Sequence, residues 1–248
     1  MEKLTSLKNP KVQEWRSLKE KKAREEQKAF LVEGVRMVRE ALSSSFEVEA
    51  LILREDYHPE FDLPSDVPVY LLPVHVFQSV SDTKTPQGIA AVLSLKTLDV
   101  SGPHLIALDG LQDPGNVGTI IRTADAAGFD GVILSPDCAD LYSPKVLRST
   151  MGSIFRLGCT FPASLPDMLN TLKKDGYSVI SSQLDGDPFY ERKEIFSSFV
   201  LIIGNEGNGI SEEVKAVATH RFCLPMRGGA ESLNAAVAAG IMMYDLTR

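Results

Sequence analysis

The sequence has few of the residues that build disulfide-bonded or metal-binding proteins. Its 248 residues include only three cysteines, Cys138, Cys159 and Cys223, and no C-x-x-C pair. That number and spacing argue against a disulfide framework and a structural zinc site, so we expect the thiols to be buried as small apolar groups. The histidines are scattered without H-E-x-x-H spacing, at His58, His75, His104 and His220. We therefore expect no metal ion.

Long apolar runs are also missing. No stretch approaches the roughly 18 apolar residues that are needed to span a bilayer. The amino-terminal residues MEKLTSLKNPKVQEW carry charges and contain no apolar core of a secretory signal. We expect a cytoplasmic protein without a membrane partner.

Basic residues are in the minority, but they are unevenly distributed. The net charge is −7, whereas residues 1–40 hold 11 Lys and Arg against 7 Asp and Glu. Nucleic-acid binding depends on local basic surface more than on whole-chain charge. A solvated helix face is the simpler explanation of such a segment, and RNA contact is the alternative.

The first 95 residues predict a small α/β domain. Helical patterns alternate with strand patterns there, the helices at 9–30, 35–42 and 73–81 and the strands at 30–34, 48–55, 67–72 and 88–95. The polar stretch KTLDVSGP at 96–103 is typical of a linker. We therefore divide the chain into a domain at 1–95, a linker at 96–103 and a second domain at 104–248.

The second domain alternates regularly between strand and helix patterns. The predicted strands lie at 104–110, 131–135, 177–182, 199–204 and 221–226, and the predicted helices at 116–128, 143–152, 165–176, 211–218 and 232–246. Such alternation, with nearly continuous apolar strands, predicts an α/β fold with a mostly parallel sheet and helices on both faces.

Three polar, glycine-rich clusters follow strands of this sheet, at 109–128, 204–211 and 224–234. Each cluster alone has an ordinary explanation, because glycine and asparagine serve tight turns and Asp113, Ser211 or Ser232 would serve as helix N-caps. Parallel sheets, however, bind ligands beyond the carboxyl ends of their strands. Three clusters at one edge therefore favour a shared pocket.

Common nucleotide and hydrolase motifs are absent from these clusters. GNEGNG does not follow the G-x-G-x-x-G pattern, and the chain has neither a P-loop nor a G-x-S-x-G elbow. The remaining candidate groups are one carboxylate, two amides, a hydroxyl and a guanidinium: Glu206, Asn116, Asn234, Ser232 and Arg122. Arginine holds phosphate or stabilises an oxyanion well. The residues alone thus predict metal-free group transfer to a phosphate-bearing substrate.

Taken together, the three clusters resemble the three motifs of the SpoU (TrmH-like) family of RNA ribose 2′-O-methyltransferases, within the SPOUT superfamily. The matching segments are DPGNVGTIIRTADAAG, IIGNEGNGIS and LPMRGGAESLNAAVAAG, in the family's order. The front part is similar to the family's substrate-binding domain, a ribosomal-protein-like α/β unit, through SLKNPKVQEW, FLVEG and TPQGIAAV.

The resemblance implies a trefoil-knotted catalytic domain that binds S-adenosyl-L-methionine and works as a homodimer. Threaded chains are rare, and nothing in the sequence pattern itself predicts the knot. Carried onto this chain, the family's cofactor site comprises Gly204, Leu224, Met226, Ser232 and Leu233. Asn116, Arg122, Glu206 and Asn234 belong to its catalytic end, together with Ser232.

The resemblance also suggests a role for Arg122. Methyl transfer consumes the positive charge of a sulfonium as a ribose hydroxyl loses its proton, so a cation beside the hydroxyl favours the reaction. We hypothesise that Arg122 grips RNA phosphate and lowers the cost of ionising the 2′-hydroxyl. A neutral guanidine is disfavoured as the base by arginine's pKa above about 12, and a phosphate or a water relay is an equal alternative.

Four functions are compatible with this pattern. The preferred one is methylation of ribosomal RNA, because an added domain suits shape recognition of structured RNA. The alternatives are a transfer-RNA ribose methyltransferase, an RNA-binding or ribosome-assembly module without catalysis, and a small-molecule methyltransferase. The basic front segment argues against the last.

Overall fold

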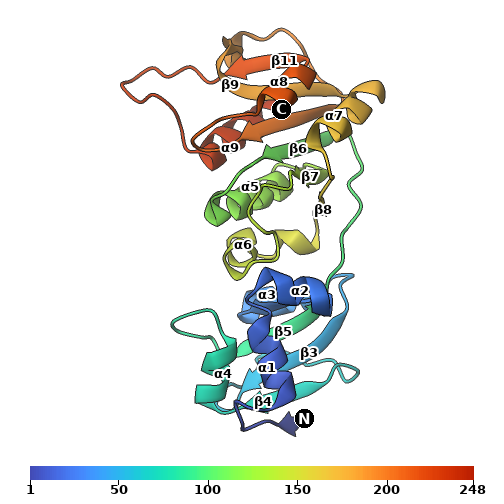
Figure 1. The fold of residues 1–248 in the computed structure, drawn as a ribbon, viewed down its shortest axis with the longest axis vertical. Coiled ribbons are helices and arrows are strands. Elements are labelled where there is room, and N and C mark those ends of the chain that lie inside the picture. Colours follow the sequence, from blue (N-terminus) through green and yellow to red (C-terminus); the bar gives the residue numbers. More distant parts are fainter. The chain divides into compact units, whose positions relative to one another are not determined.

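The computed structural model describes residues 1–248, which form two compact units (Figure 1). The first unit consists of Met1–Lys96 and Tyr142–Phe155, and the second of Thr97–Leu141 and Arg156–Arg248.

The first unit is a five-stranded mixed sheet with helices. Its strands are ordered β1-β4-β3-β5-β2, with β5 antiparallel to both β2 and β3. Its elements are β1 (Glu2–Lys3), α1 (Pro10–Ser17), α2 (Lys21–Gln27), β2 (Ala29–Glu33), α3 (Val35–Leu42), β3 (Val48–Arg54), β4 (Val69–Leu72), α4 (Val74–Val80), β5 (Ile89–Ser94), α6 (Pro144–Thr150) and η1 (Ser153–Phe155). The smaller α/β unit predicted from the sequence is therefore present.

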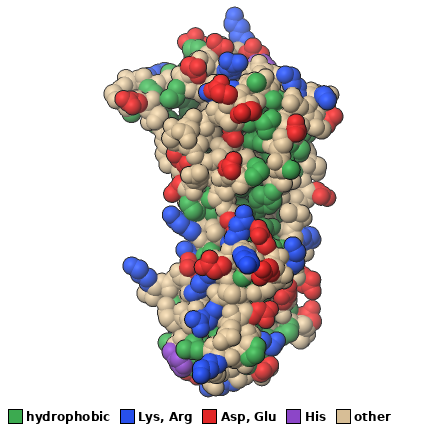
Figure 2. Space-filling model, viewed as in Figure 1, with side chains coloured by type: hydrophobic (Ala, Val, Ile, Leu, Met, Phe, Trp, Pro, Cys, Tyr) green, Lys and Arg blue, Asp and Glu red, His purple; other side chains and the backbone are tan.

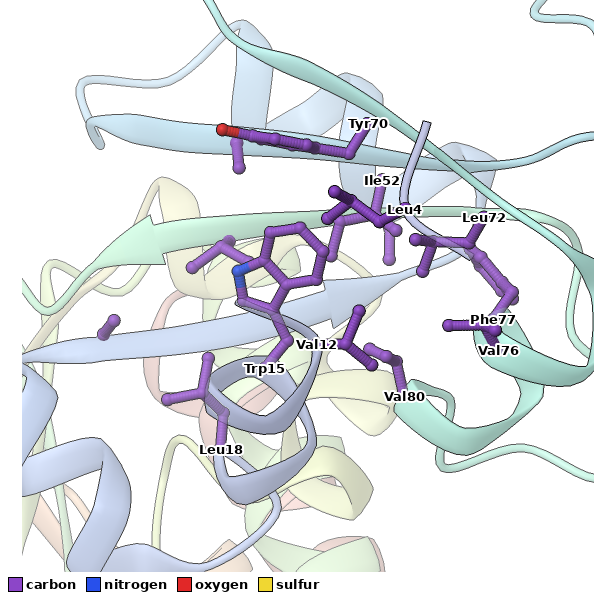
Figure 3. Close-up of a cluster of buried hydrophobic side chains, with 14 residues drawn as sticks. Leu4, Val12, Trp15, Leu18, Ile52, Tyr70, Leu72, Val76, Phe77 and Val80 are labelled. Carbon is purple, nitrogen blue, oxygen red and sulfur yellow. The ribbon is translucent and has the colours of Figure 1, made fainter. Parts of the chain in front are cut away.

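The core of this unit gathers around Trp15 of α1 (Figure 3). The Trp15 ring meets the Tyr70 ring edge to face, with centroids 5.1 Å apart. Asn9 caps α1 by accepting a hydrogen bond from the backbone N–H of Lys11, and Pro10 occupies the first turn. Val12, Trp15 and Leu18 are all buried, so their helical spacing marks the face that packs on the sheet.

The helical pattern expected at 9–30 is two helices in the structure. The buried guanidinium of Arg24 donates hydrogen bonds from Nη1 to the carbonyl oxygens of Leu18 (2.6 Å) and Lys19 (2.7 Å). These bonds satisfy the carbonyls where α1 ends, and so a break is stable at this point.

The basic surface of the front segment is partly neutralised. In α2, Lys21 pairs with Glu25 (3.9 Å) and Lys22 with Glu26 (3.8 Å), both at i,i+4 spacing. Figure 2 shows blue and red side chains interspersed on the visible face of this part of the chain. Part of the basic excess at 1–40 is thus a solvated helix face.

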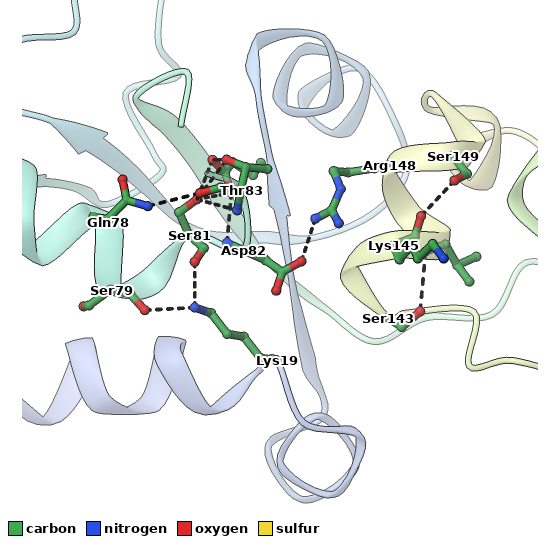
Figure 4. A network of polar contacts seen from close by, with 12 residues as sticks. Lys19, Gln78, Ser79, Ser81, Asp82, Thr83, Ser143, Lys145, Arg148 and Ser149 are labelled. Carbon is green, nitrogen blue, oxygen red and sulfur yellow. Dashed lines mark hydrogen bonds and ion pairs between the residues drawn. The ribbon is translucent and has the colours of Figure 1, made fainter. Parts of the chain in front are cut away.

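The segment 142–155 lies inside the range 104–248 of the sequence division, yet it packs with the first unit. Its aromatic rings explain this: the Tyr142 ring lies 4.8 Å from that of Phe30, and the Phe155 ring 5.3 Å from that of Phe46, centroid to centroid. Arg148 of α6 also pairs with Asp82 at 2.8 Å (Figure 4). Near this pair, the Lys19 ammonium donates to the carbonyl oxygens of Ser79 and Ser81 (Figure 4).

The second unit is a six-stranded sheet in which every pair of neighbouring strands is parallel, in the order β11-β9-β10-β6-β7-β8. Its elements are β6 (His104–Asp109), α5 (Pro114–Ala126), β7 (Gly131–Leu134), β8 (Gly158–Thr160), α7 (Leu165–Lys174), β9 (Ser178–Pro188), η2 (Phe189–Glu191), β10 (Phe199–Gly204), α8 (Glu212–Val217), β11 (His220–Cys223) and α9 (Ala235–Leu246). This confirms the predicted parallel α/β fold and adds the short strand β8.

Helices cover both faces of this sheet. Helices α7 and α8 share one apolar cluster with alternate strand residues such as Leu105 and Ala107. Helices α5 and α9 pack against each other, and they contact β7 and β10. Ile106 and Leu108 are equally buried, and they face this other side because strand side chains alternate.

The strand order creates a switch point between β6 and β10. From β6 the chain proceeds to β7 on one side, and from β10 it proceeds to β11 on the other. Asp109 at the end of β6 pairs in register with Gly204 at the end of β10. Ligands of open parallel sheets bind in the crevice at such a point.

The expected burial of the three cysteines is found for one of them. Cys159 is buried, and burial raises the pKa of its thiol to about 12. Cys138 and Cys223 are partly exposed, so the expected burial is wrong for these two, and all three thiols are free. Separately, no helix is both long enough and apolar enough to traverse a bilayer.

Candidate active site

The first cluster forms the turn between β6 and α5. Asp113 caps the helix, and its Oδ1 accepts a hydrogen bond from the backbone N–H of Asn116 at 2.8 Å. Pro114 is the first helical residue, as its fixed φ and missing N–H favour. The helix thus begins two residues earlier than expected, so Asn116 lies in its first turn and not in the loop before it.

The second cluster forms a closed turn after β10. Asn205 and Gly209 exchange two backbone hydrogen bonds of 2.9 and 3.0 Å. Gly209 has a φ of +70°, which favours glycine. Gly204 is required for another reason, because a Cβ there would lie 2.4 Å from the carbonyl carbon of Gly209.

The third cluster leads into α9. Asn234 caps this helix, and its Oδ1 accepts hydrogen bonds from the backbone N–H groups of Ala236 (2.9 Å) and Val237 (3.3 Å). The helix therefore begins at Ala235 and not at Ser232, and Ser232 is not its cap. Residues 225–233 form no hydrogen bonds within the chain, and Figure 1 shows this loop running out from the body of the unit.

Three side chains join the clusters to one another. The Glu206 carboxylate accepts hydrogen bonds from the Asn116 amide (3.0 Å) and from the backbone N–H groups of Asp113 (3.2 Å) and Gln112 (3.4 Å). The Asn234 amide donates to Oδ1 of Asn116 at 3.0 Å. The chain Glu206–Asn116–Asn234, which we call the amide–carboxylate cluster, therefore links all three sequence motifs at the switch point.

The hydrogen bonds keep Glu206 ionised. Partial burial raises its pKa, but the Asn116 amide and the backbone N–H groups of Glu206, Asp113 and Gln112 outweigh burial, so the pKa is lowered. Glu206 is thus an acceptor at neutral pH and does not donate a proton. Its carboxylate holds the Asn116 amide in one orientation.

Replacing Glu206 by glutamine should destabilise the fold by about 1 kcal/mol at neutral pH, because the amide offers only one acceptor oxygen to three donors. A lowered folded-state pKa contributes stability that is present above the unfolded pKa of about 4.3 and is lost as the pH falls through the folded value. Denaturant unfolding at about pH 7, 5 and 3.5 should therefore show that the difference in unfolding free energy from wild type shrinks only at the lowest pH.

The matched control is Glu191→Gln, because the Glu191 side chain is exposed and forms no hydrogen bond. Equal pH profiles for the two variants would contradict this role.

Arg122 and Ser232 are not part of the amide–carboxylate cluster. Arg122 is on the exposed side of α5, about 9 Å along the helix axis from Asn116, and its guanidinium forms no hydrogen bond or ion pair in the chain. Ser232 is exposed as well. Of the residues predicted for the catalytic end, the structure thus brings together Asn116, Glu206 and Asn234.

The predicted cofactor residues lie around the same sheet edge. Gly204 ends β10, while Leu224 and Met226 follow β11 and are partly exposed. Leu233 is exposed immediately before the Asn234 cap. No group of three or more His, Cys, Asp or Glu side chains is arranged to hold a metal ion.

Sequence reasoning missed two polar residues of this site, Asp109 and Asn205. Asp109 Oδ2 accepts a hydrogen bond from the backbone N–H of Ser211 at 2.7 Å, and the Asn205 amide donates to the carbonyl oxygen of Gly110 at 2.7 Å. The sequence marks these two residues only by their position, because each stands at the end of a predicted strand beside a glycine.

Both units of the chain are similar in sequence to known proteins. Residues 103–244 match the model of the SpoU rRNA Methylase family, and residues 9–91 match that of the MRM3-like substrate binding domain. The chain is 38% identical over 247 residues to the Bacillus subtilis 23S rRNA (guanosine(2553)-2′-O)-methyltransferase RlmP, covering 99% of both chains.

Solved structures of similar fold also include RNA methyltransferases. A TrmH-family protein from Porphyromonas gingivalis aligns with a TM-score of 0.88 at 36% identity, covering 97% of this chain and 98% of that one. An AdoMet-bound rRNA methyltransferase from Sinorhizobium meliloti aligns with a TM-score of 0.87 at 30% identity, covering 99% and 97%. The chain therefore belongs to the SpoU rRNA methylase family of S-adenosylmethionine-dependent RNA ribose 2′-O-methyltransferases.

Proposed function

We propose that this enzyme methylates the 2′-hydroxyl of a guanosine in 23S ribosomal RNA, in the cytoplasm. The observation that carries the proposal is the amide–carboxylate cluster, which joins the three motifs at the switch point of a parallel sheet. The guanosine and the 23S molecule are the substrate named for the B. subtilis relative, with which this chain aligns from end to end.

The loop after β11 suits S-adenosylmethionine. Its donors and acceptors at 225–233 are free of bonds within the chain, and Leu224, Met226 and Leu233 offer apolar side chains to an adenosyl group. Gly204 and Ser232 complete the proposed contacts. The cofactor supplies a methyl group on a positively charged sulfur. No cation lies in the amide–carboxylate cluster, so nothing there repels that charge.

We assign Arg122 to the RNA side of the reaction. Its guanidinium has no partner in the chain and is free to pair with a phosphate or to stabilise the ionising 2′-oxygen. Glu206 holds Asn116, and Asn116 with Asn234 fixes the starts of α5 and α9 next to each other. We assign Ser232, two residues before the Asn234 cap, to the same end of the site.

The front unit is proposed to bind the RNA. Lys8, Arg16 and Arg36 are exposed cations that form no ion pair, in contrast to the paired lysines of α2. Unpaired cations of this kind neutralise phosphates and make binding dependent on salt.

We further propose that the enzyme is a homodimer built on α9. Leu233, Val237, Ile241 and Tyr244 lie at spacings of four, four and three residues and are 39%, 51%, 37% and 54% exposed. An apolar stripe that runs from Leu233, just before α9, along a helix that already packs on α5 is typical of an interface. The stripe begins beside Asn234, so a partner chain there would adjoin the amide–carboxylate cluster.

Replacing Ile241 by aspartate should convert the dimer to a monomer, since a carboxylate in an apolar interface is desolvated without a partner. Light scattering should report half the wild-type mass, and methyl transfer should fall by at least tenfold because the partner's contribution is lost. Ile195→Asp is the matched control, because Ile195 is 98% exposed outside the stripe. A monomeric wild type at assay concentration, or a fully active monomeric variant, would contradict the dimer.

Mapping of ribose methylation across total RNA tests the proposed function. Cells that lack the gene should lose one 2′-O-methylguanosine in 23S rRNA and regain it when the gene is restored. Loss of a mark from transfer RNA, or no loss anywhere, would refute the ribosomal assignment. The second outcome would favour the assembly module considered above.

A further inference from the structure

Asn205 immediately precedes Glu206 and is tied to both sides of the switch point. Its amide nitrogen donates to the carbonyl oxygen of Gly110, after β6, at 2.7 Å. Its Oδ1 accepts hydrogen bonds from the backbone N–H groups of Gly207 (2.9 Å) and Asn208 (3.0 Å) within its own turn. One side chain thus shapes the turn that carries Glu206 and anchors that turn to the first cluster.

A second tie holds the other end of the same turn. Asp109, the last residue of β6, accepts the backbone N–H of Ser211 at 2.7 Å. Between these ties, the backbone pair of Asn205 with Gly209 closes the turn. The tip bearing Glu206 is therefore fixed to the end of β6 from both sides.

We propose that Asn205 is a positioning residue for methyl transfer, which sets the Glu206 carboxylate at hydrogen-bonding distance from the Asn116 amide. The inference rests on the proposed function of the amide–carboxylate cluster. Glu206 meets its three donors at 3.0–3.4 Å, so a small displacement of the turn lengthens all three bonds together. Displacements of about 1 Å at supporting residues cost up to about 100-fold in rate.

The test variant is Asn205→Asp, which keeps the Oδ1 acceptor and replaces the amide donor by an oxygen that faces the Gly110 carbonyl. In single-turnover methyl transfer to 23S rRNA from cells lacking the gene, the rate constant should fall about 10- to 100-fold. The KM for RNA should change less than twofold, because the Asn205 side chain forms hydrogen bonds only to Gly110 and within its own turn. Asn208→Asp is the control: it adds the same charge in the same turn, and the Asn208 side chain forms no hydrogen bond.

The pH dependence separates positioning from a general loss of structure. Protonating the new carboxyl group creates an O–H that can donate to the Gly110 carbonyl oxygen. The Gly110 carbonyl oxygen and the adjacent Glu206 carboxylate both disfavour a charged carboxylate here, so the pKa of the new group is raised above the ordinary value of about 3.9. The rate of Asn205→Asp relative to wild type should therefore rise as the pH falls from about 8 to about 5, while the ratio for Asn208→Asp stays flat. Circular dichroism gives the folded fraction, by which each rate is divided.

Three results would overturn the inference. One is an Asn205→Asp rate equal to that of Asn208→Asp, another is a flat pH ratio, and the third is a normal rate per folded molecule. In each case an active wild type would leave the proposed function standing. A wild type that transfers no methyl group to 23S rRNA would instead refute the proposed function and, with it, this inference.

Discussion

Replacing Arg122 by alanine should lower the rate of methyl transfer by about 100- to 1,000-fold, the range seen when a group that stabilises an oxyanion is removed. The affinity for S-adenosylmethionine should stay within twofold. The proposed role puts the guanidinium beside the ribose oxygen and phosphate, away from the sulfonium, which a cation would repel. Calorimetry with the cofactor and single-turnover kinetics with RNA measure the two effects separately.

The substitution Arg122→Lys tests the geometry of the guanidinium. Lysine keeps the charge but loses the planar fork that binds phosphate with two hydrogen bonds, so we expect about a tenfold loss of rate. Arg221→Lys is the control, as Arg221 is an exposed guanidinium on β11 outside the three clusters. An Arg122→Lys rate equal to wild type would contradict a role that requires the fork.

Replacing Gly204 by alanine should destabilise the enzyme by about 3 kcal/mol or more and abolish cofactor binding. The added Cβ would lie 2.4–2.5 Å from the backbone of Gly209 and Ile210, and backbone cannot rotate away as a side chain can. The turn would have to open, which displaces Glu206 from Asn116. Thermal unfolding should show a fall of roughly 6–12 °C for a protein of this size.

Gly228→Ala is the matched control for Gly204→Ala. Gly228 belongs to the third cluster, and a Cβ there would meet nothing within 4 Å. This variant should therefore unfold within about 1 °C of wild type. If Gly204→Ala were as stable as Gly228→Ala and bound the cofactor, the closed turn would not be essential to the site.

The sheet of the second unit could be predicted because its strands are short, nearly continuous apolar runs. Strand β8 was missed because its three residues, Gly158–Thr160, are too few to form a pattern. The break between α1 and α2 was missed for a different reason. It depends on the Arg24 guanidinium reaching back to the Leu18 and Lys19 carbonyls, which helical spacing does not encode.

The site residues that belong to the three glycine-rich motifs after strands could be predicted from the sequence. Glu206, Asn116 and Asn234 were identified in this way, and their contacts span 90 and 118 positions of sequence. Asn205 and Asp109 were missed, because a hydrogen bond to a carbonyl or N–H about 100 positions away leaves no local trace. The start of α9 at Ala235 was likewise misjudged, since Ser232 and Asn234 are both good caps.

The packing of residues 142–155 with the first unit could not be predicted from chain order. The aromatic contacts of Tyr142 and Phe155 decide it, and they depend on tertiary structure alone. The expected trefoil knot stays a prediction from family resemblance, because threading leaves no mark on hydrophobic periodicity.

The most direct test of the account is a crystal structure with S-adenosylhomocysteine, the product that the cofactor becomes after methyl transfer. The adenosyl group should lie against Gly204, Leu224, Met226 and Leu233, with the sulfur facing the amide–carboxylate cluster and Arg122 of one chain within reach of the same cleft. Density for the ligand at another edge of the sheet, or a sulfur turned away from Asn116 and Glu206, would contradict the account.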